Sequence, residues 1–84
     1  MATKPVHRMG DIDTNGNAAI EVSPNVFANN KGIHRLGDVD NVGDVLIQGC
    51  RNVFVNNKLC GRLGDIDSRG NTKIQGSPNV FAGS

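Results

Sequence analysis

Two histidines and two cysteines give the chain its clearest capacity for metal chemistry. His7 and His34 are 27 residues apart at the same place in a repeated sequence, and Cys60 precedes Gly61, which occupies that place a third time. Imidazole and thiolate ligands suit zinc or iron, and a small domain gains folding free energy from a structural ion. We therefore predict one structural zinc or iron ion held by His7, His34 and Cys60, with Cys50 as the alternative cysteine ligand.

The hairpins expected at the repeat boundaries leave a second interpretation open. If the two adjacent asparagines before Lys58 form a two-residue turn, Cys60 lies opposite Val53. The equivalent turn one repeat earlier places His34 opposite Asn25. The cysteine and the histidine then lie on opposite faces, because a shift of one residue reverses a strand side chain. Both histidines would then be hairpin residues bonded to neighbouring groups. A Cys50–Cys60 disulfide is a further alternative.

Acidic residues near the first turn resemble part of a calcium loop. Asp11, Asp13 and Asn15 have the spacing of an EF-hand, but the closing carboxylate, Glu21, comes one residue early. The other two repeats have glutamine at that place. We therefore interpret the first aspartate of each Gly-Asp-x-Asp sequence as an acceptor for turn amides. These aspartates are Asp11, Asp38 and Asp65.

An arginine precedes each of these aspartates by three positions, as Arg8, Arg35 and Arg62. The three arginines either form a set of repeated ion pairs or remain solvated at the surface, where such pairs add little stability. No nucleophile with a base and an orienting group is recognisable, and histidines at equivalent repeat positions indicate a structural role. We therefore expect that the protein is not an enzyme.

The elements that position these side chains come from a repeat of 27 residues, with units at about 7–33, 34–60 and 61–84. Such self-similarity decides the architecture, and 84 residues make one small domain with a limited core. A formal net charge of +1 argues against a nucleic-acid partner. We find no apolar run long enough for a membrane span and no secretion signal, so we expect reduced thiols.

Short strands joined by turns are predicted in every unit. Residues 8–13 alternate apolar and polar side chains, Asn15-Gly16 is a turn, and residues 18–22 and 25–28 are further strands. Asn29-Asn30 predicts a tight hairpin into the next unit. The last strand, around Val80-Phe81, has no following partner. We expect it to pair with residues 5–8, which would close the three units into a ring.

The apolar residues repeat as triplets, which we expect to form the layers of a compact all-β domain with pseudo-threefold symmetry. In particular, the three phenylalanines are expected around a central axis, where truncation of a buried ring would cost about 3–5 kcal/mol. The triplets are Met9/Leu36/Leu63, Ile12/Val39/Ile66, Ile20/Ile47/Ile74, Val26/Val53/Val80 and Phe27/Phe54/Phe81.

The repeats resemble the PAAR-repeat family. The matching segments are Pro5-Val6-His7-Arg8-Met9-Gly10-Asp11 with its two later copies, and Gly76-Ser77-Pro78-Asn79-Val80-Phe81 with Val22-Ser23-Pro24-Asn25-Val26-Phe27. This resemblance covers nearly the whole chain and implies a small conical domain of three β-hairpin repeats. It also implies an apical metal held by His and Cys in the loops after Gly-Asp. Here those loops contain Thr14-Asn15, Asn41-Val42 and Ser68-Arg69, with no histidine or cysteine among them.

The resemblance implies a mechanical function. We expect a structural tip, bound one chain per trimer to a homotrimeric β-helical spike protein, that sharpens the spike for piercing the target cell envelope. The contact is expected through corresponding residues of the three repeats, such as the Ile20/Ile47/Ile74 or Val26/Val53/Val80 triplets, or through the phenylalanine triplet if it is exposed. Contact with the target membrane would be transient. The expected location is the baseplate of a contractile phage tail in the virion, after synthesis in the host cytoplasm. The alternatives are the spike tip of a type VI secretion apparatus and a free-standing metal-binding β module.

Overall fold

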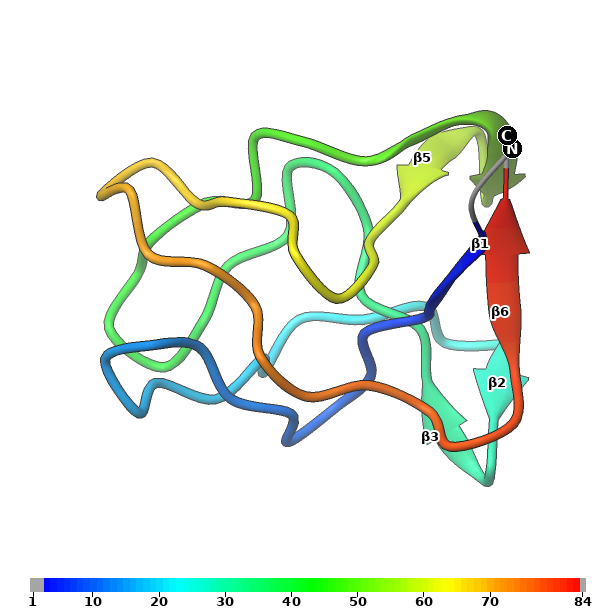
Figure 1. The fold of residues 1–84 in the computed structure, drawn as a ribbon, viewed down its shortest axis with the longest axis horizontal. Helices are drawn as coiled ribbons and strands as arrows, with labels where there is room; N and C mark the ends of the chain where they lie inside the picture. The colour runs from blue at the N-terminus through cyan, green and yellow to red at the C-terminus, as the bar shows by residue number, and fades with distance from the viewer. Residues whose placement is uncertain (1–2, 84) are drawn as a thin grey trace.

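Three two-stranded antiparallel sheets organise the chain in the computed structural model, which describes residues 3–83 (Figure 1). The described residues contain no helix, and therefore none with the length and apolarity of a membrane span. The sheets lie together at one end of the molecule, and long turns fill the other end. The paired strands are β1 (Thr3–Pro5) with β6 (Phe81–Gly83), β2 (Phe27–Ala28) with β3 (Lys31–Gly32), and β4 (Cys50–Val55) with β5 (Lys58–Cys60).

The pairing of β1 with β6 joins the two ends of the described chain. Pro5 lies opposite Phe81 and Thr3 lies opposite Gly83. The amide of Val6 also donates to the carbonyl oxygen of Val80 at 3.1 Å. This confirms the expected pairing of the N-terminal segment with the last strand, and it places the residues before the first repeat beside the end of the third repeat.

The other two sheets are hairpins with the expected turns. Asn29, Asn30, Asn56 and Asn57 all have positive φ angles, between 54° and 66°. Asparagine tolerates this left-handed conformation better than most residues because its short polar side chain can form local hydrogen bonds. The paired asparagines therefore predicted both hairpins correctly.

Backbone hydrogen bonds connect the three repeats in a closed cycle. His34 N–H donates to the carbonyl oxygen of His7, His7 N–H to that of Gly61, and Gly61 N–H to that of His34, at 2.8–3.0 Å. Glycine is required at the third position, because a Cβ there would lie 2.7 Å from the His34 carbonyl oxygen. The cycle satisfies backbone groups at the place where all three units meet.

The core differs from the expected apolar layers. Phe27, Phe54 and Phe81 are 53–62% exposed, and the equivalent isoleucines at positions 20, 47 and 74 are also exposed. The prediction that these two triplets are buried is therefore wrong. Side chains alternate between the two faces of a strand, so Val26 and Ala28 point inward while Phe27 points outward.

Smaller apolar residues fill the interior near the sheets, and Val26, Val53 and Val80 pack against them. Met9 is also exposed, while its equivalents Leu36 and Leu63 and the Ile12/Val39/Ile66 triplet are half-buried. This apolar cluster consists of Val6, Ala28, Ile33, Cys50, Val55, Cys60 and Ala82.

Candidate functional site

Charged and polar side chains fill the remainder of the interior, beginning with repeated arginine–aspartate pairs. Arg8 Nε donates to Asp11 at 2.9 Å and Arg35 Nε donates to Asp38 at 2.7 Å, and all four side chains are buried. Each aspartate also accepts the backbone amide of its arginine. The expected amide bonds are therefore present, and of the two alternatives for the arginines the structure has internal ion pairs at Arg8 and Arg35.

The third pair is looser because the third repeat lacks one hydrogen-bond partner. Arg8 and Arg35 each donate to an asparagine side chain 21 residues further on, Asn29 and Asn56. The residue at that distance from Arg62 is Gly83, and Arg62 Nε lies 4.0 Å from its aspartate, Asp65. Burial raises the pKa of Asp65. The hydrogen bond from the backbone amide of Arg62 and the positive charge of its side chain lower this pKa, but they offset the effect of burial only in part.

The two histidines meet in the interior. Their ring centroids are 5.4 Å apart in an edge-to-face arrangement, and both side chains are fully buried. Nδ1 of His7 donates to the carbonyl oxygen of Gln75, and Nδ1 of His34 donates to that of Glu21, both at 2.8 Å. These bonds leave Nε2 of each ring as the unprotonated nitrogen, and neither Nε2 has a hydrogen-bond partner among residues 3–83.

Burial is the main reason that both histidines are neutral at pH 7. It lowers the pKa of His7 to about 4, and the charges of His34 and Lys73 act in the same direction against the bond to Gln75. Burial likewise lowers the pKa of His34, followed by the positive charge of Lys73. The lone pairs of two neutral imidazoles are therefore available inside the protein.

Acidification should consequently destabilise the fold. His7 binds a proton with a pKa near 6.5 when unfolded and only near pH 4 when folded, so the free energy of unfolding should fall between these values. The loss from His7 alone should be about 3 kcal/mol once the pH reaches 4. An NMR titration of the His7 Cε1–H signal tests this directly. The same signal in urea-unfolded protein is the control, and a folded-state midpoint near 6.5 would contradict the prediction.

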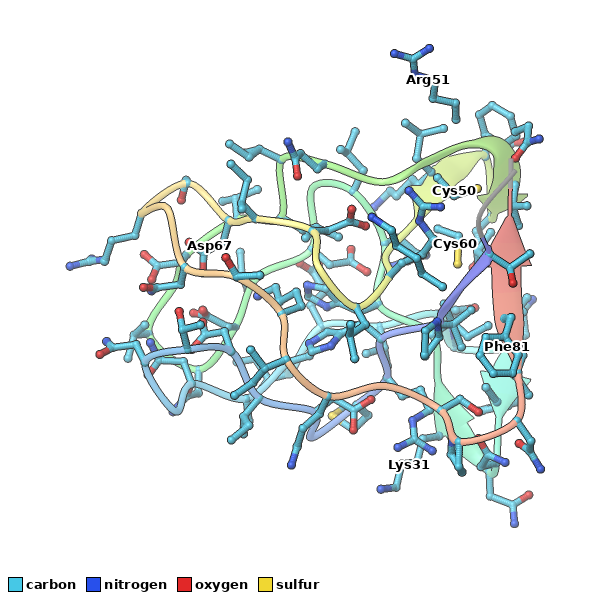
Figure 2. All side chains as sticks on the ribbon, in the orientation of Figure 1. Lys31, Cys50, Arg51, Cys60, Asp67 and Phe81 are labelled. Atoms are coloured by element: carbon cyan, nitrogen blue, oxygen red, sulfur yellow. The ribbon has the colours of Figure 1, made fainter. Side chains whose placement is uncertain are left out.

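Both cysteines are buried free thiols on neighbouring strands (Figure 2). Cys60 lies opposite Cys50, not opposite Val53 as expected, because an irregularity in β4 between Cys50 and Phe54 shifts the register. Burial raises the pKa of Cys60 to about 12. The thiol of Cys50 donates to the carbonyl oxygen of Gly83.

Among residues 3–83, Cys60 does not lie close enough to two other metal-ligating side chains for all three ligand atoms to be within 4.8 Å of one another. The ligand set of His7, His34 and Cys60, with Cys50 as the alternative cysteine, therefore stays a prediction. Of these residues, the structure brings the two histidines together.

A group of three aspartates does meet this criterion. Asp13, Asp40 and Asp67 come from the three repeats, are fully buried, and have carboxylate oxygens within 4.8 Å of one another. This triad could hold a metal ion. Asp67 lies in the half of the molecule away from the cysteines (Figure 2). Glu21, the expected closing residue of a calcium loop, instead accepts the amide of Val39 at an exposed position.

Lys73 is buried beside the triad. Its Nζ lies 3.7 Å from Asp67 Oδ2 and 4.0 Å from Asp13 Oδ2, and its side chain is 1% exposed. Burial opposes ionisation of Asp67, but the backbone amides of Asn71 and Arg69, together with Lys73, lower the pKa of Asp67 overall. The interior therefore contains ionised aspartate next to ammonium.

Sequence reasoning did not identify this aspartate–lysine cluster, although a signal was present. The three aspartates are the second acid of every Gly-Asp-x-Asp sequence, and Lys73 stands where the other repeats have Ala19 and Leu46. A charged residue at a buried apolar repeat position indicates an internal partner.

No protein-family model matches the chain, and a comparison with curated proteins gives no match.

Proposed function

We propose that this protein is the tip of a homotrimeric β-helical spike in a contractile tail. In this proposal the three repeats surround an approximate threefold axis and form a cone that sharpens the spike for penetration of the target envelope. The setting is the baseplate of a phage virion, assembled in the host cytoplasm. A type VI secretion spike would require the same mechanics.

The observation that carries the proposal is the exposure of three phenylalanines at one repeat position. Phe27, Phe54 and Phe81 belong to β2, β4 and β6, and each therefore lies on a different sheet. All three sheets are at the same end of the molecule (Figure 1). Large exposed apolar side chains gathered on a small protein mark an interaction surface. One aromatic residue per repeat suits a partner with three identical subunits.

A trimeric β-helix would benefit from being covered at its end. Its terminal strands present unpaired backbone groups, which favour aggregation unless another chain covers them. We therefore assign the sheet end of the tip to the spike and the turn end to the target. The contact per subunit would need no more than the roughly 800 Å² of a standard interface.

Stoichiometry tests the proposal. The protein would be co-expressed with a homotrimeric β-helical spike protein from the contractile tail of the same source, and the complex weighed by native mass spectrometry. One chain per trimer is expected. Three chains per trimer, or cross-links from a single repeat to the spike, would refute the capping role.

A pair of triple variants tests which surface binds. Serine at positions 27, 54 and 81 should weaken spike binding at least about 100-fold, because aromatic anchors dominate interfaces. The fold should survive, since these side chains are already exposed. Serine at positions 20, 47 and 74 replaces three similarly exposed isoleucines and is the matched control. Equal binding by both variants and the wild type would contradict the assigned surface.

The aspartate triad favours a second candidate, the free-standing metal-binding β module. Such a module would bind its ion without a spike, and it would not form a stable complex with a trimeric β-helix. The co-expression experiment therefore distinguishes the two functions, because only the tip requires the trimer.

A further inference from the structure

The three buried aspartates are fixed by their own turns through one oxygen each. Oδ1 of Asp13 accepts the backbone amides of Asn15 and Asn17 at 2.9 and 3.0 Å. Asp40 and Asp67 accept the two corresponding amides of their turns at 2.9–3.0 Å. Each carboxylate is thereby held in one orientation before any ligand binds, which reduces the ordering cost of binding.

The second oxygen of each aspartate remains available. Oδ2 of Asp13, Asp40 and Asp67 is buried and has no hydrogen-bond partner among residues 3–83. Buried acceptors without a partner are costly, and buried carboxylates normally pair or coordinate a metal. Three such oxygens, one from each repeat, therefore form a set of ligand atoms suited to a cation.

Lys73 supplies only part of the required positive charge. Its Nζ approaches two of these oxygens but makes no hydrogen bond, although the side chain is almost fully buried. Counted by formal charge, three aspartates and one lysine leave this cluster two units negative. The two histidines are neutral and do not balance this charge. Arg69 does not balance it either, because its guanidinium pairs with Asp44.

We propose that Oδ2 of Asp13, Asp40 and Asp67 binds one divalent hard cation of the Mg²⁺, Ca²⁺ and Mn²⁺ class. Oxygen-only ligands favour these ions, whereas the histidines and cysteines expected from the sequence would favour zinc or iron. A divalent ion matches this formal imbalance, and Lys73 supplies the remaining positive charge beside the site. The ion joins the three repeats, and this role does not depend on the spike.

Metal binding to the purified full chain tests the proposal. After treatment with EDTA and its removal, Mn²⁺ would be titrated and followed by electron paramagnetic resonance, with Ca²⁺ and Mg²⁺ as competitors. One Mn²⁺ per chain is expected. A saturating ion should raise the unfolding temperature by roughly 10 °C, because it binds the folded state. If the wild type binds no Mn²⁺ and its unfolding temperature does not change on addition of EDTA or of any of the three ions, the proposal is wrong.

Charge-matched variants locate the ion. Asp40→Asn retains an oxygen for the turn amides but removes the inward charge, and should weaken Mn²⁺ binding at least about tenfold. Glu21→Gln removes the same charge from an exposed side chain, at a position where the other repeats have Gln48 and Gln75, and should leave binding unchanged. Equal weakening by both variants would overturn the proposed site.

Lys73→Leu introduces the residue that the second repeat has at the equivalent position, Leu46. It removes a positive charge that lies beside the site and repels the ion, and it should therefore strengthen Mn²⁺ binding. Weaker binding by this variant would show that Lys73 and the aspartates do not share one cation site. The wild-type titration needs no variant, so the proposal remains testable even if a substitution prevents folding.

Discussion

Removal of residues 1–6 is expected to abolish cooperative folding. The deletion eliminates β1, exposes the pairing edge of β6, and removes Val6 from the apolar cluster. It also removes the carbonyl groups that accept the amides of Leu63 and Ser77. Burial of one valine contributes about 1.5–3 kcal/mol and each hydrogen bond about 1 kcal/mol. Because a domain of this size has a total stability of only about 5–15 kcal/mol, little would remain.

Thermal unfolding followed by circular dichroism would measure this effect. A graded variant, Val6→Ala, should lose about 2 kcal/mol, because two buried methyl groups are removed. Thr3→Ala in the same strand changes an exposed side chain and is the matched control. A sharp transition at the wild-type temperature after the deletion would show that the closing sheet does not stabilise the domain.

The second large effect is expected at the buried Arg35–Asp38 pair. Asp38→Ala should cost about 3–5 kcal/mol, because it leaves a buried guanidinium without its carboxylate. Arg35 also donates to Asn56, so its side chain cannot leave the interior without breaking a further bond. Urea unfolding would give the change in free energy.

The third repeat provides the control for this measurement. Asp65→Ala should cost clearly less, since Arg62 Nε lies 4.0 Å from Asp65 and lacks the asparagine partner. Replacement of both Arg35 and Asp38 by apolar residues should recover much of the loss, because no buried charge is then unpaired. Equal costs for Asp38→Ala and Asp65→Ala would contradict this account.

The sequence by itself determined the repeats, the all-β class, the hairpins and the closing strand pair. These features follow from local physical chemistry. Paired asparagines adopt left-handed turns, and a final strand without a following partner pairs with the free N-terminal segment. The spacing of arginine and aspartate left both ion pairs and solvated side chains open, and the structure shows the pairs because three positions connect the residues across one tight turn.

Only the tertiary structure decided which repeated side chains face inward. Apolar character alone indicated a buried phenylalanine layer, yet the strands point these rings outward. The shifted register in β4 decided that Cys60 faces Cys50. The aspartate triad and Lys73 are distant in sequence and meet only where the three repeats converge. Burial and charge pairing depend on this convergence, which no single repeat encodes.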